Sequence, residues 1–247
     1  MVGSLYGAVP ICGIGRMMYW VLPIVVITGL LGMYMWQSWC PQKPRKKRSK
    51  HRILCIGDSI TFGAGVIPTR LRNSYPAILN RMLGKAYQVL NYGISGATAQ
   101  KNTDHPYESS FLQAAQDTDP EICILMLGTN DSKLHNWNPE RYEAALEHWV
   151  HRIMQFPTKP RIILAAPPAV FSVNGKPVVF GIRDAVISGE VLPTVKRVSE
   201  KYNTAFLDLY SHTASHPEWF GDGVHPNVQG NHEIAARIYN ELIKWRE

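Results

Sequence analysis

The sequence predicts an α/β protein of three layers, with helices on both faces of a five-stranded, mostly parallel sheet, preceded by one transmembrane helix. Five short apolar runs rich in β-formers lie between residues 52 and 210. Stretches with apolar residues at helical spacing separate them, and this alternation is typical of a parallel sheet. An uncharged run near the amino terminus predicts the additional helix.

The uncharged run covers residues 17–36, and a helix of that length spans about 30 Å, the thickness of a bilayer's hydrocarbon core. Tyr and Trp residues near both ends favour the membrane interface. A cleaved signal peptide fits less well, because the run is long, only Arg16 precedes it and no small-residue cleavage site follows. A buried core helix rarely lacks a polar face. We therefore expect a flank at 1–16 and a transmembrane helix at 17–39.

Basic residues are concentrated immediately after this run. Residues 1–52 contain eight Lys and Arg and no acidic residue, whereas the rest of the chain contains 18 basic and 19 acidic residues. The net charge of +7 therefore does not indicate nucleic-acid binding, which needs basic residues spread over a folded face. Residues 40–51, with two prolines, are predicted to be a solvated juxtamembrane linker. The basic cluster at 43–52 is expected to attract anionic lipid.

The same cluster predicts the side of the membrane on which the domain lies. Seven basic residues follow the apolar run within 43–52, and Arg16 alone precedes it. By the positive-inside rule this single-pass protein would hold its carboxyl-terminal domain in the cytoplasm. A folded domain can also be exported despite a basic flank, so an extracytoplasmic domain is the alternative.

The domain is expected to cover residues 52–247 and to begin with a strand. The predicted strands are 52–56, 87–93, 121–128, 161–167 and 204–210. The third is apolar throughout, as expected for a strand with helices on both faces. Cys55 and Cys123 lie within predicted strands, where buried free cysteines act as small hydrophobic residues. We see no metal-ligand spacing and expect no metal or cofactor.

Helical periodicity separates these strands. Residues 74–83 are predicted to be a helix capped by Ser74. Residues 138–156 begin with Asn138 as cap and Pro139 at the first helical position. Residues 184–202 are helical in period, but an internal glycine and proline predict a kink or two short helices. The closing segment, from about residue 228 to 246, is amphipathic.

A parallel sheet brings the loops after its strands to one edge, where sites usually form. The relevant loops are 57–66, 93–105, 128–138 and 208–227. Each has an ordinary explanation alone: a glycine that permits a tight turn, a helix cap, a turn pair or a surface histidine. Their joint occurrence in this order, each at a strand end, favours a functional site.

Four motifs in these loops resemble the blocks of the SGNH (GDSL-type) hydrolase superfamily, in family order. They are GDS at 57–59, SGAT with Gly96, GTND at 128–131 and DGVHP at 222–226. The resemblance covers about residues 52–247 and implies a flavodoxin-like fold and a serine esterase that needs no cofactor. The membrane segment is not part of the family pattern.

The residues themselves indicate the chemistry. A serine hydroxyl such as that of Ser59 needs a base within hydrogen-bonding reach, and His225 can take and return a proton near pH 7. Asp222, three residues earlier, can orient the imidazole. The resemblance implies an oxyanion hole made of the backbone N–H groups of Ser59 and Gly96 and the Asn130 amide. We expect Ser59 to be acylated during ester hydrolysis.

The ester itself is less defined. The stretches 180–193 and 207–227 resemble members that remove acetyl groups from sugars, including sialate O-acetylesterase-like proteins. His135 and Trp137 could face a sugar, but packing roles are favoured for both. A lysophospholipase or thioesterase acting on acyl chains is the alternative, favoured by a membrane location. A non-catalytic membrane scaffold is the alternative from another class, which the intact set of Ser59, Asn130, Asp222 and His225 argues against.

Overall fold

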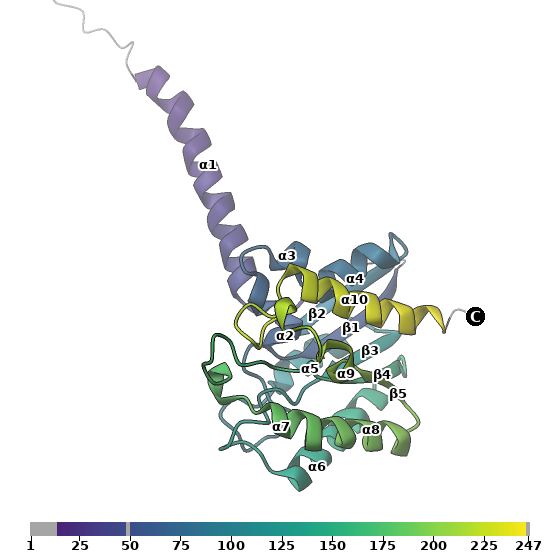
Figure 1. The fold of residues 1–247 in the computed structure, drawn as a ribbon. Coiled ribbons are helices and arrows are strands. Elements are labelled where there is room, and N and C mark those ends of the chain that lie inside the picture. Colours follow the sequence, from purple (N-terminus) through teal and green to yellow (C-terminus); the bar gives the residue numbers. More distant parts are fainter. Residues whose placement is uncertain (1–13, 48–49, 246–247) are drawn as a thin grey trace, which may run out of the picture. The chain divides into compact units, whose positions relative to one another are not determined.

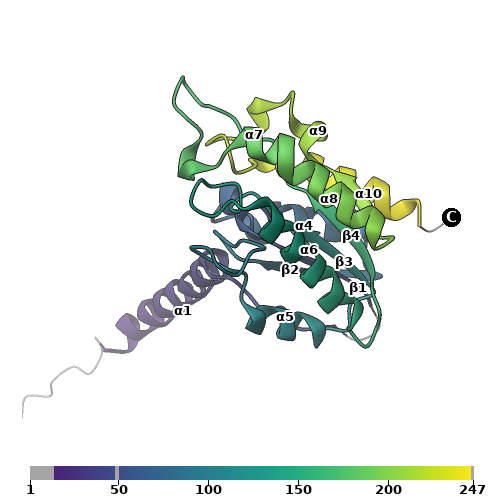
Figure 2. The same ribbon diagram turned by 90° about the horizontal axis from the view of Figure 1, so that it is seen from below.

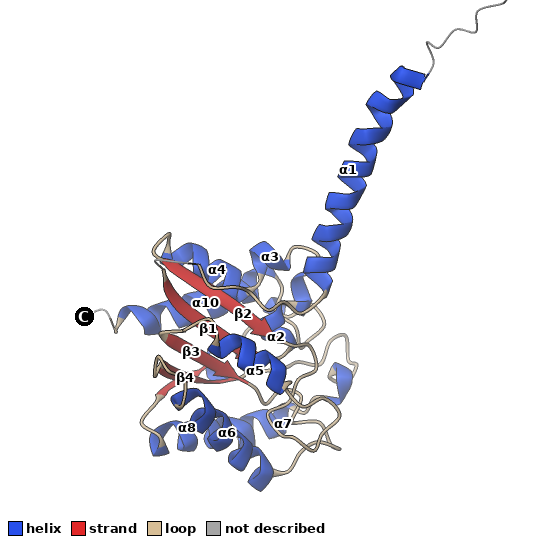
Figure 3. Ribbon diagram, turned by 180° about the vertical axis from the view of Figure 1, so that it is seen from behind, coloured by secondary structure: helices blue, strands red, loops and turns tan. Residues whose placement is uncertain are grey.

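A single parallel sheet organises the domain. The computed structural model describes the backbone of residues 14–47 and 50–245, and side chains in the first range from residue 25 onward. The strands are β1 (His51–Gly57), β2 (Tyr87–Gly93), β3 (Ile122–Met126), β4 (Arg161–Ala166) and β5 (Ala205–Asp208). They lie in the order β2-β1-β3-β4-β5, and each neighbouring pair is parallel (Figure 3). The five predicted strands are thus confirmed.

Helices cover both faces of this sheet (Figure 1). The helices of the domain are α2 (Ser59–Phe62), α3 (Arg70–Asn73), α4 (Tyr75–Leu83), α5 (Ser109–Gln116), α6 (Pro139–Met154), α7 (Asp184–Val186), α8 (Leu192–Lys201), α9 (Tyr210–Thr213) and α10 (Val228–Ile243). Within β1, Ile53 packs in a cluster with α4 and α10, whereas its neighbour Leu54 packs in a cluster with α5, α6 and α8. This period of two buries both faces and gives the predicted three layers.

The predicted helices are present with local differences. The Asn138 side chain caps α6 by accepting a hydrogen bond from Arg141 N, as the sequence predicts. No side-chain cap hydrogen bond is made at Ser74, which precedes α4. The segment predicted to kink at 184–202 contains a π-helical turn, Ile187–Val191, between α7 and α8. Helix α5 lies in a region for which the sequence predicted no element.

The amino-terminal region forms a helix, α1 (Ile14–Trp39). Where side chains are described, no helix is both long and apolar enough to cross a membrane. A span needs about 20 apolar residues, and residues 17–24 of the predicted transmembrane helix at 17–39 lie outside the described side chains. The predicted transmembrane helix is therefore not supported by the structure.

The basic segment after α1 lies on the surface of the domain, although the sequence predicts a solvated linker. The Gln88 side chain donates to Arg45 O at 2.9 Å and accepts from Lys47 N at 2.7 Å. Lys46 forms an ion pair with Asp119. The compact unit of the domain accordingly begins at Pro41. Hydrogen bonds to backbone groups fix this segment, and hydropathy patterns do not register such contacts.

Two glycines allow α2 to lie directly on the carboxyl ends of β1 and β2. A Cβ added to Gly57 would lie 2.1 Å from Thr61 Oγ1, and one added to Gly93 would lie 2.2 Å from Phe62 N. Both distances are far below van der Waals contact. The turn after β1 can therefore start a helix at Ser59 while remaining against the sheet.

The contact at Gly93 gives a test of this arrangement. Gly93→Ala forces the added methyl group against the backbone of α2, and such overpacking costs about 1–3 kcal/mol. We expect the free energy of unfolding in urea to fall by this amount. Gly189→Ala is the matched control, since a Cβ there meets nothing within 4 Å. Equal stability of the two variants would contradict the close approach of α2 to the sheet.

Candidate active site

Ser59 is the first residue of α2, at the carboxyl end of β1. Its side chain is buried, with the residue 7% exposed. Asp58 precedes it as the helix cap, and Asp58 Oδ1 accepts a hydrogen bond from Ile60 N at 2.9 Å. Asp58 thus braces the turn that carries Ser59. The strand end and its cap together hold the Ser59 hydroxyl in one position.

The turn that carries His225 is organised by the carboxylate of Asp222. Asp222 Oδ1 accepts from Val224 N at 2.9 Å and from His225 N at 2.7 Å. Asp222 Oδ2 lies 2.6 Å from His225 Nδ1. One carboxylate therefore fixes both the backbone of the turn and the imidazole ring.

The imidazole also faces the serine. His225 Nε2 lies 3.0 Å from Ser59 Oγ. An ionised carboxylate only accepts hydrogen bonds, so the Asp222 contact places the ring proton on Nδ1 and leaves Nε2 to accept from the serine hydroxyl. The structure thus brings the three residues together in the order that a serine nucleophile requires.

A close backbone contact holds the loop after β1 against the turn that carries His225. A Cβ on Gly65 would lie 2.4 Å from Pro226 O and 3.0 Å from His225 Cβ. Asn231, in the first turn of α10, donates to Pro226 O at 2.7 Å and accepts from Tyr75 N at 2.8 Å. The loop after β1 and the turn before α10 are therefore in direct contact beside the serine–histidine pair.

The residues of the expected oxyanion hole come from the neighbouring loops. Gly96, in the loop after β2, has φ of +82°, a conformation that side chains disfavour. Asn130, in the loop after β3, is 5% exposed, and its Nδ2 donates to Ala97 O at 3.1 Å. This bond places the Asn130 amide beside the loop of Gly96. As the first residue of α2, Ser59 has no acceptor within the helix for its own N–H.

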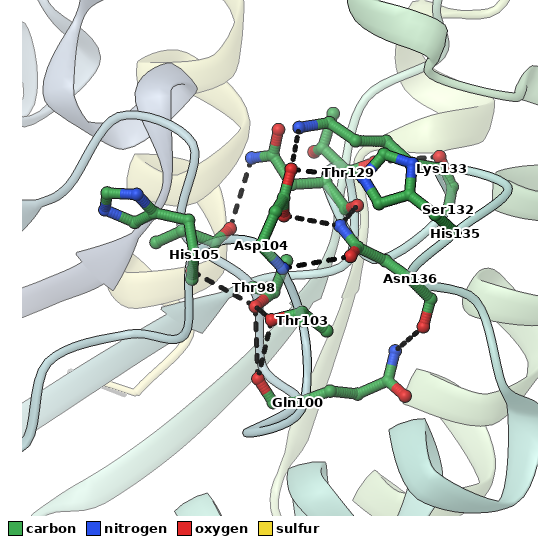
Figure 4. Close-up of polar contacts among 12 residues, drawn as sticks. Thr98, Gln100, Thr103, Asp104, His105, Thr129, Ser132, Lys133, His135 and Asn136 are labelled. Atoms are coloured by element: carbon green, nitrogen blue, oxygen red, sulfur yellow. Dashed lines mark hydrogen bonds and ion pairs between the residues drawn. The ribbon is translucent and has the colours of Figure 1, made fainter.

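Buried polar groups join the same two loops. Asp131, which is fully buried, accepts from Ala99 N at 3.0 Å and Gln100 N at 3.1 Å. Figure 4 shows the neighbouring contacts, in which Asn136 Nδ2 donates to Asp104 Oδ1 at 2.7 Å. Asp131 belongs to the GTND motif, whereas Asn136 belongs to none of the four motifs. Because their partners lie more than 30 positions away, local sequence gives no signal for these bonds.

Two residues considered for sugar binding have other contacts. The Trp137 indole Nε1 donates to Glu190 Oε2 at 3.0 Å, and its ring packs 5.3 Å from that of Tyr142. His135 Nε2 lies 3.2 Å from Asp104 Oδ2 (Figure 4). The packing role, which the sequence favoured for Trp137, agrees with these contacts.

Comparison with known proteins supplies the family. Residues 55–232 match the GDSL-like lipase/acylhydrolase family. The chain belongs to this family. An acetylxylan esterase of Xylanibacter ruminicola is 31% identical over 221 residues, which cover 81% of this chain. This chain spans 45% of the length of that relative.

Solved structures show the same fold. Est24, a carbohydrate acetylesterase from Sinorhizobium meliloti, aligns with a TM-score of 0.65 and 21% identity over 79% of this chain and 100% of its own. The aryl esterase of M. smegmatis aligns with a TM-score of 0.66 and 21% identity over 78% and 99% of the two chains. The family match therefore places the chain among the GDSL-type (SGNH) hydrolases, and the solved structures share its fold.

The carboxyl groups of the hydrolase differ in their pKa. Burial raises the pKa of Asp58 and of Asp131 to about 6, against hydrogen bonds that lower both values. Burial would also raise the pKa of Asp222, but hydrogen bonds from the His225 ring and from the backbone outweigh it and lower the pKa to about 2. Asp222 is therefore an anion at neutral pH, as the orientation of His225 requires.

The buried Asp58 gives a pH-dependent test. Its folded pKa of about 6 exceeds the ordinary value of about 3.9, so the folded hydrolase retains a proton that the unfolded chain loses between these values. Stability should fall as the pH rises through this window and then level off. Asp58→Asn keeps a capping oxygen and removes the charge. Above pH 6 we expect the free energy of unfolding of the variant to exceed that of the wild type by up to about 3 kcal/mol. This difference should shrink toward pH 4.

Denaturant unfolding at several pH values between 4 and 7.5 measures this difference. Asp117→Asn, at an exposed position, is the matched control for loss of an acidic residue. A constant difference between Asp58→Asn and the wild type across this range would refute the assigned titration.

Proposed function

We propose that the protein hydrolyses short-chain esters, chiefly acetyl esters of carbohydrates, through an acyl-enzyme intermediate on Ser59. The hydrogen-bonded series from Asp222 through His225 to Ser59 carries this proposal. The acetylxylan esterase relative, identical at 31% of aligned positions, supports the substrate class.

In the first half of the reaction, Ser59 Oγ attacks the ester carbonyl while its proton passes to His225 Nε2. The carbonyl oxygen becomes an anion, stabilised by the N–H groups of Ser59 and Gly96 and by the Asn130 amide. A single donor of this kind lowers the barrier by about 3 kcal/mol. His225 then gives its proton to the leaving alcohol. Water repeats these steps on the acyl-serine and releases the acid.

Ser59→Ala tests the function directly. The variant lacks the hydroxyl that forms the acyl intermediate, so hydrolysis of p-nitrophenyl acetate and of acetylated xylo-oligosaccharides should fall by about 10⁴-fold or more. A fluorophosphonate probe should label the wild type and leave the variant unlabelled. Intact-protein mass spectrometry reads out the label. Labelling that survives the substitution would exclude Ser59 as the nucleophile.

The cellular location stays a prediction that rests on the charge bias of residues 43–52 against Arg16. We expect a domain that faces the cytoplasm, and protease added to intact cells should then leave it undigested until the membrane is permeabilised. Digestion in unpermeabilised cells would place the domain outside, where wall or matrix sugars are its substrates.

A further inference from the structure

One loop connects the two parts of the active site. It runs between β4 and α7, and Figure 2 shows it extending beyond α7. At its start, Phe171 N donates to Gly223 O at 2.8 Å, within the turn that carries Asp222 and His225. At its end, Arg183 Nε donates to Ser132 O at 2.6 Å, two residues after Asn130. The loop is therefore anchored at both ends on the motifs that form the site.

The contact at Gly223 is especially close. A Cβ on this residue would lie 2.1 Å from Phe171 O, and its φ is +85°. Arg183 N adds a hydrogen bond of 3.1 Å to Ser132 Oγ. These contacts hold both ends of the loop against the motifs of the site.

Phe180, near the end of this loop, is an exposed aromatic residue in a disfavoured conformation. Its φ of +61° lies in the left-handed region, which bulky residues rarely adopt. The residue is 61% exposed, so it contributes little to the core. Its ring nevertheless lies edge-on to the ring of His225, with 5.4 Å between the centroids. Strain at an exposed residue beside a catalytic side chain indicates a functional contact.

The chemistry of the site defines which part of a substrate Phe180 faces. His225 Nε2 donates its proton to the leaving alcohol, so the alcohol lies beside the imidazole. The carbonyl oxygen lies on the opposite side, toward Gly96 and Asn130. A ring against His225 therefore contacts the alcohol part of an ester and not its acyl part.

We propose that Phe180 determines specificity for the alcohol part of the substrate, by packing its ring against the apolar C–H face of a sugar. This inference rests on the proposed function, since it requires the assigned role of His225. Hydrogen bonds to Gly223 and Ser132 hold the two ends of the loop, and the ring lies against His225, so the sugar binds to a surface that is already formed. Acyl-chain selectivity does not depend on Phe180.

Phe180→Ala distinguishes an effect on the alcohol part of the substrate from an effect on the acyl part. We expect kcat/KM for acetylated xylo-oligosaccharides to fall about fivefold or more, as loss of an aromatic contact predicts. For methyl acetate, whose alcohol is too small to reach the ring, kcat/KM should stay within about twofold. The ratio of p-nitrophenyl acetate to butyrate hydrolysis should be unchanged. Phe180→Tyr keeps the ring and should retain activity on the oligosaccharide.

Val179→Ala is the matched control, because Val179 is the adjacent exposed loop residue. Thermal unfolding confirms that each variant is folded. Equal losses on the oligosaccharide and on methyl acetate, or no loss on either, would overturn the proposal. Failure of the proposed function would instead appear as wild-type protein that hydrolyses none of these esters.

Discussion

The position of Ser59 depends on the close approach of α2 to the ends of two strands. Gly57 and Gly93 leave no room for a Cβ, so β1 can lead directly into the turn that carries Ser59. The same turn continues to Gly65, which lies against Pro226 and His225. A short stretch of backbone therefore positions Ser59 and also contacts the turn that carries His225. The hydrogen bonds among Ser59, His225 and Asp222 form within the arrangement that these glycines allow.

Buried carboxyl groups complete the arrangement at some cost to stability. Asp58 and Asp131 are fully buried, and burial raises the pKa of both. A structural role alone is served at lower cost by uncharged side chains. Each carboxyl, however, accepts backbone N–H groups of a loop that carries a site residue: Asp58 in the loop of Ser59, Asp131 in the loop of Gly96. The two buried carboxyl groups thus lower the stability of the domain but fix the loops that carry site residues, a trade-off that is common at active sites.

The sequence predicted those parts that depend on local pattern. The five strands and the Asn138 cap follow from apolar runs and capping chemistry within a few residues. The meeting of the four motifs at one edge was predictable, because a parallel sheet brings the loops after its strands to the same edge. The Asp131 network, the contacts of the basic segment and the loop that carries Phe180 were not, since they depend on hydrogen bonds between distant segments. Helix α5 was not predicted either, because its eight residues bury only a narrow apolar face and so show little helical periodicity.

Different contacts hold the two sides of the candidate site, the loops of Gly96 and Asn130 on one side and the loop of Phe180 on the other. On the side of Gly96 and Asn130, buried polar groups cross-link the two loops, so a substitution there disturbs the backbone of both. On the side of Phe180, the loop is anchored by hydrogen bonds from Phe171 N and from Arg183, and it projects an exposed ring. Side chains on that loop can vary without loss of the hydrogen bonds that orient His225. In the proposed function, alcohol specificity can therefore change while the chemistry of ester cleavage stays the same.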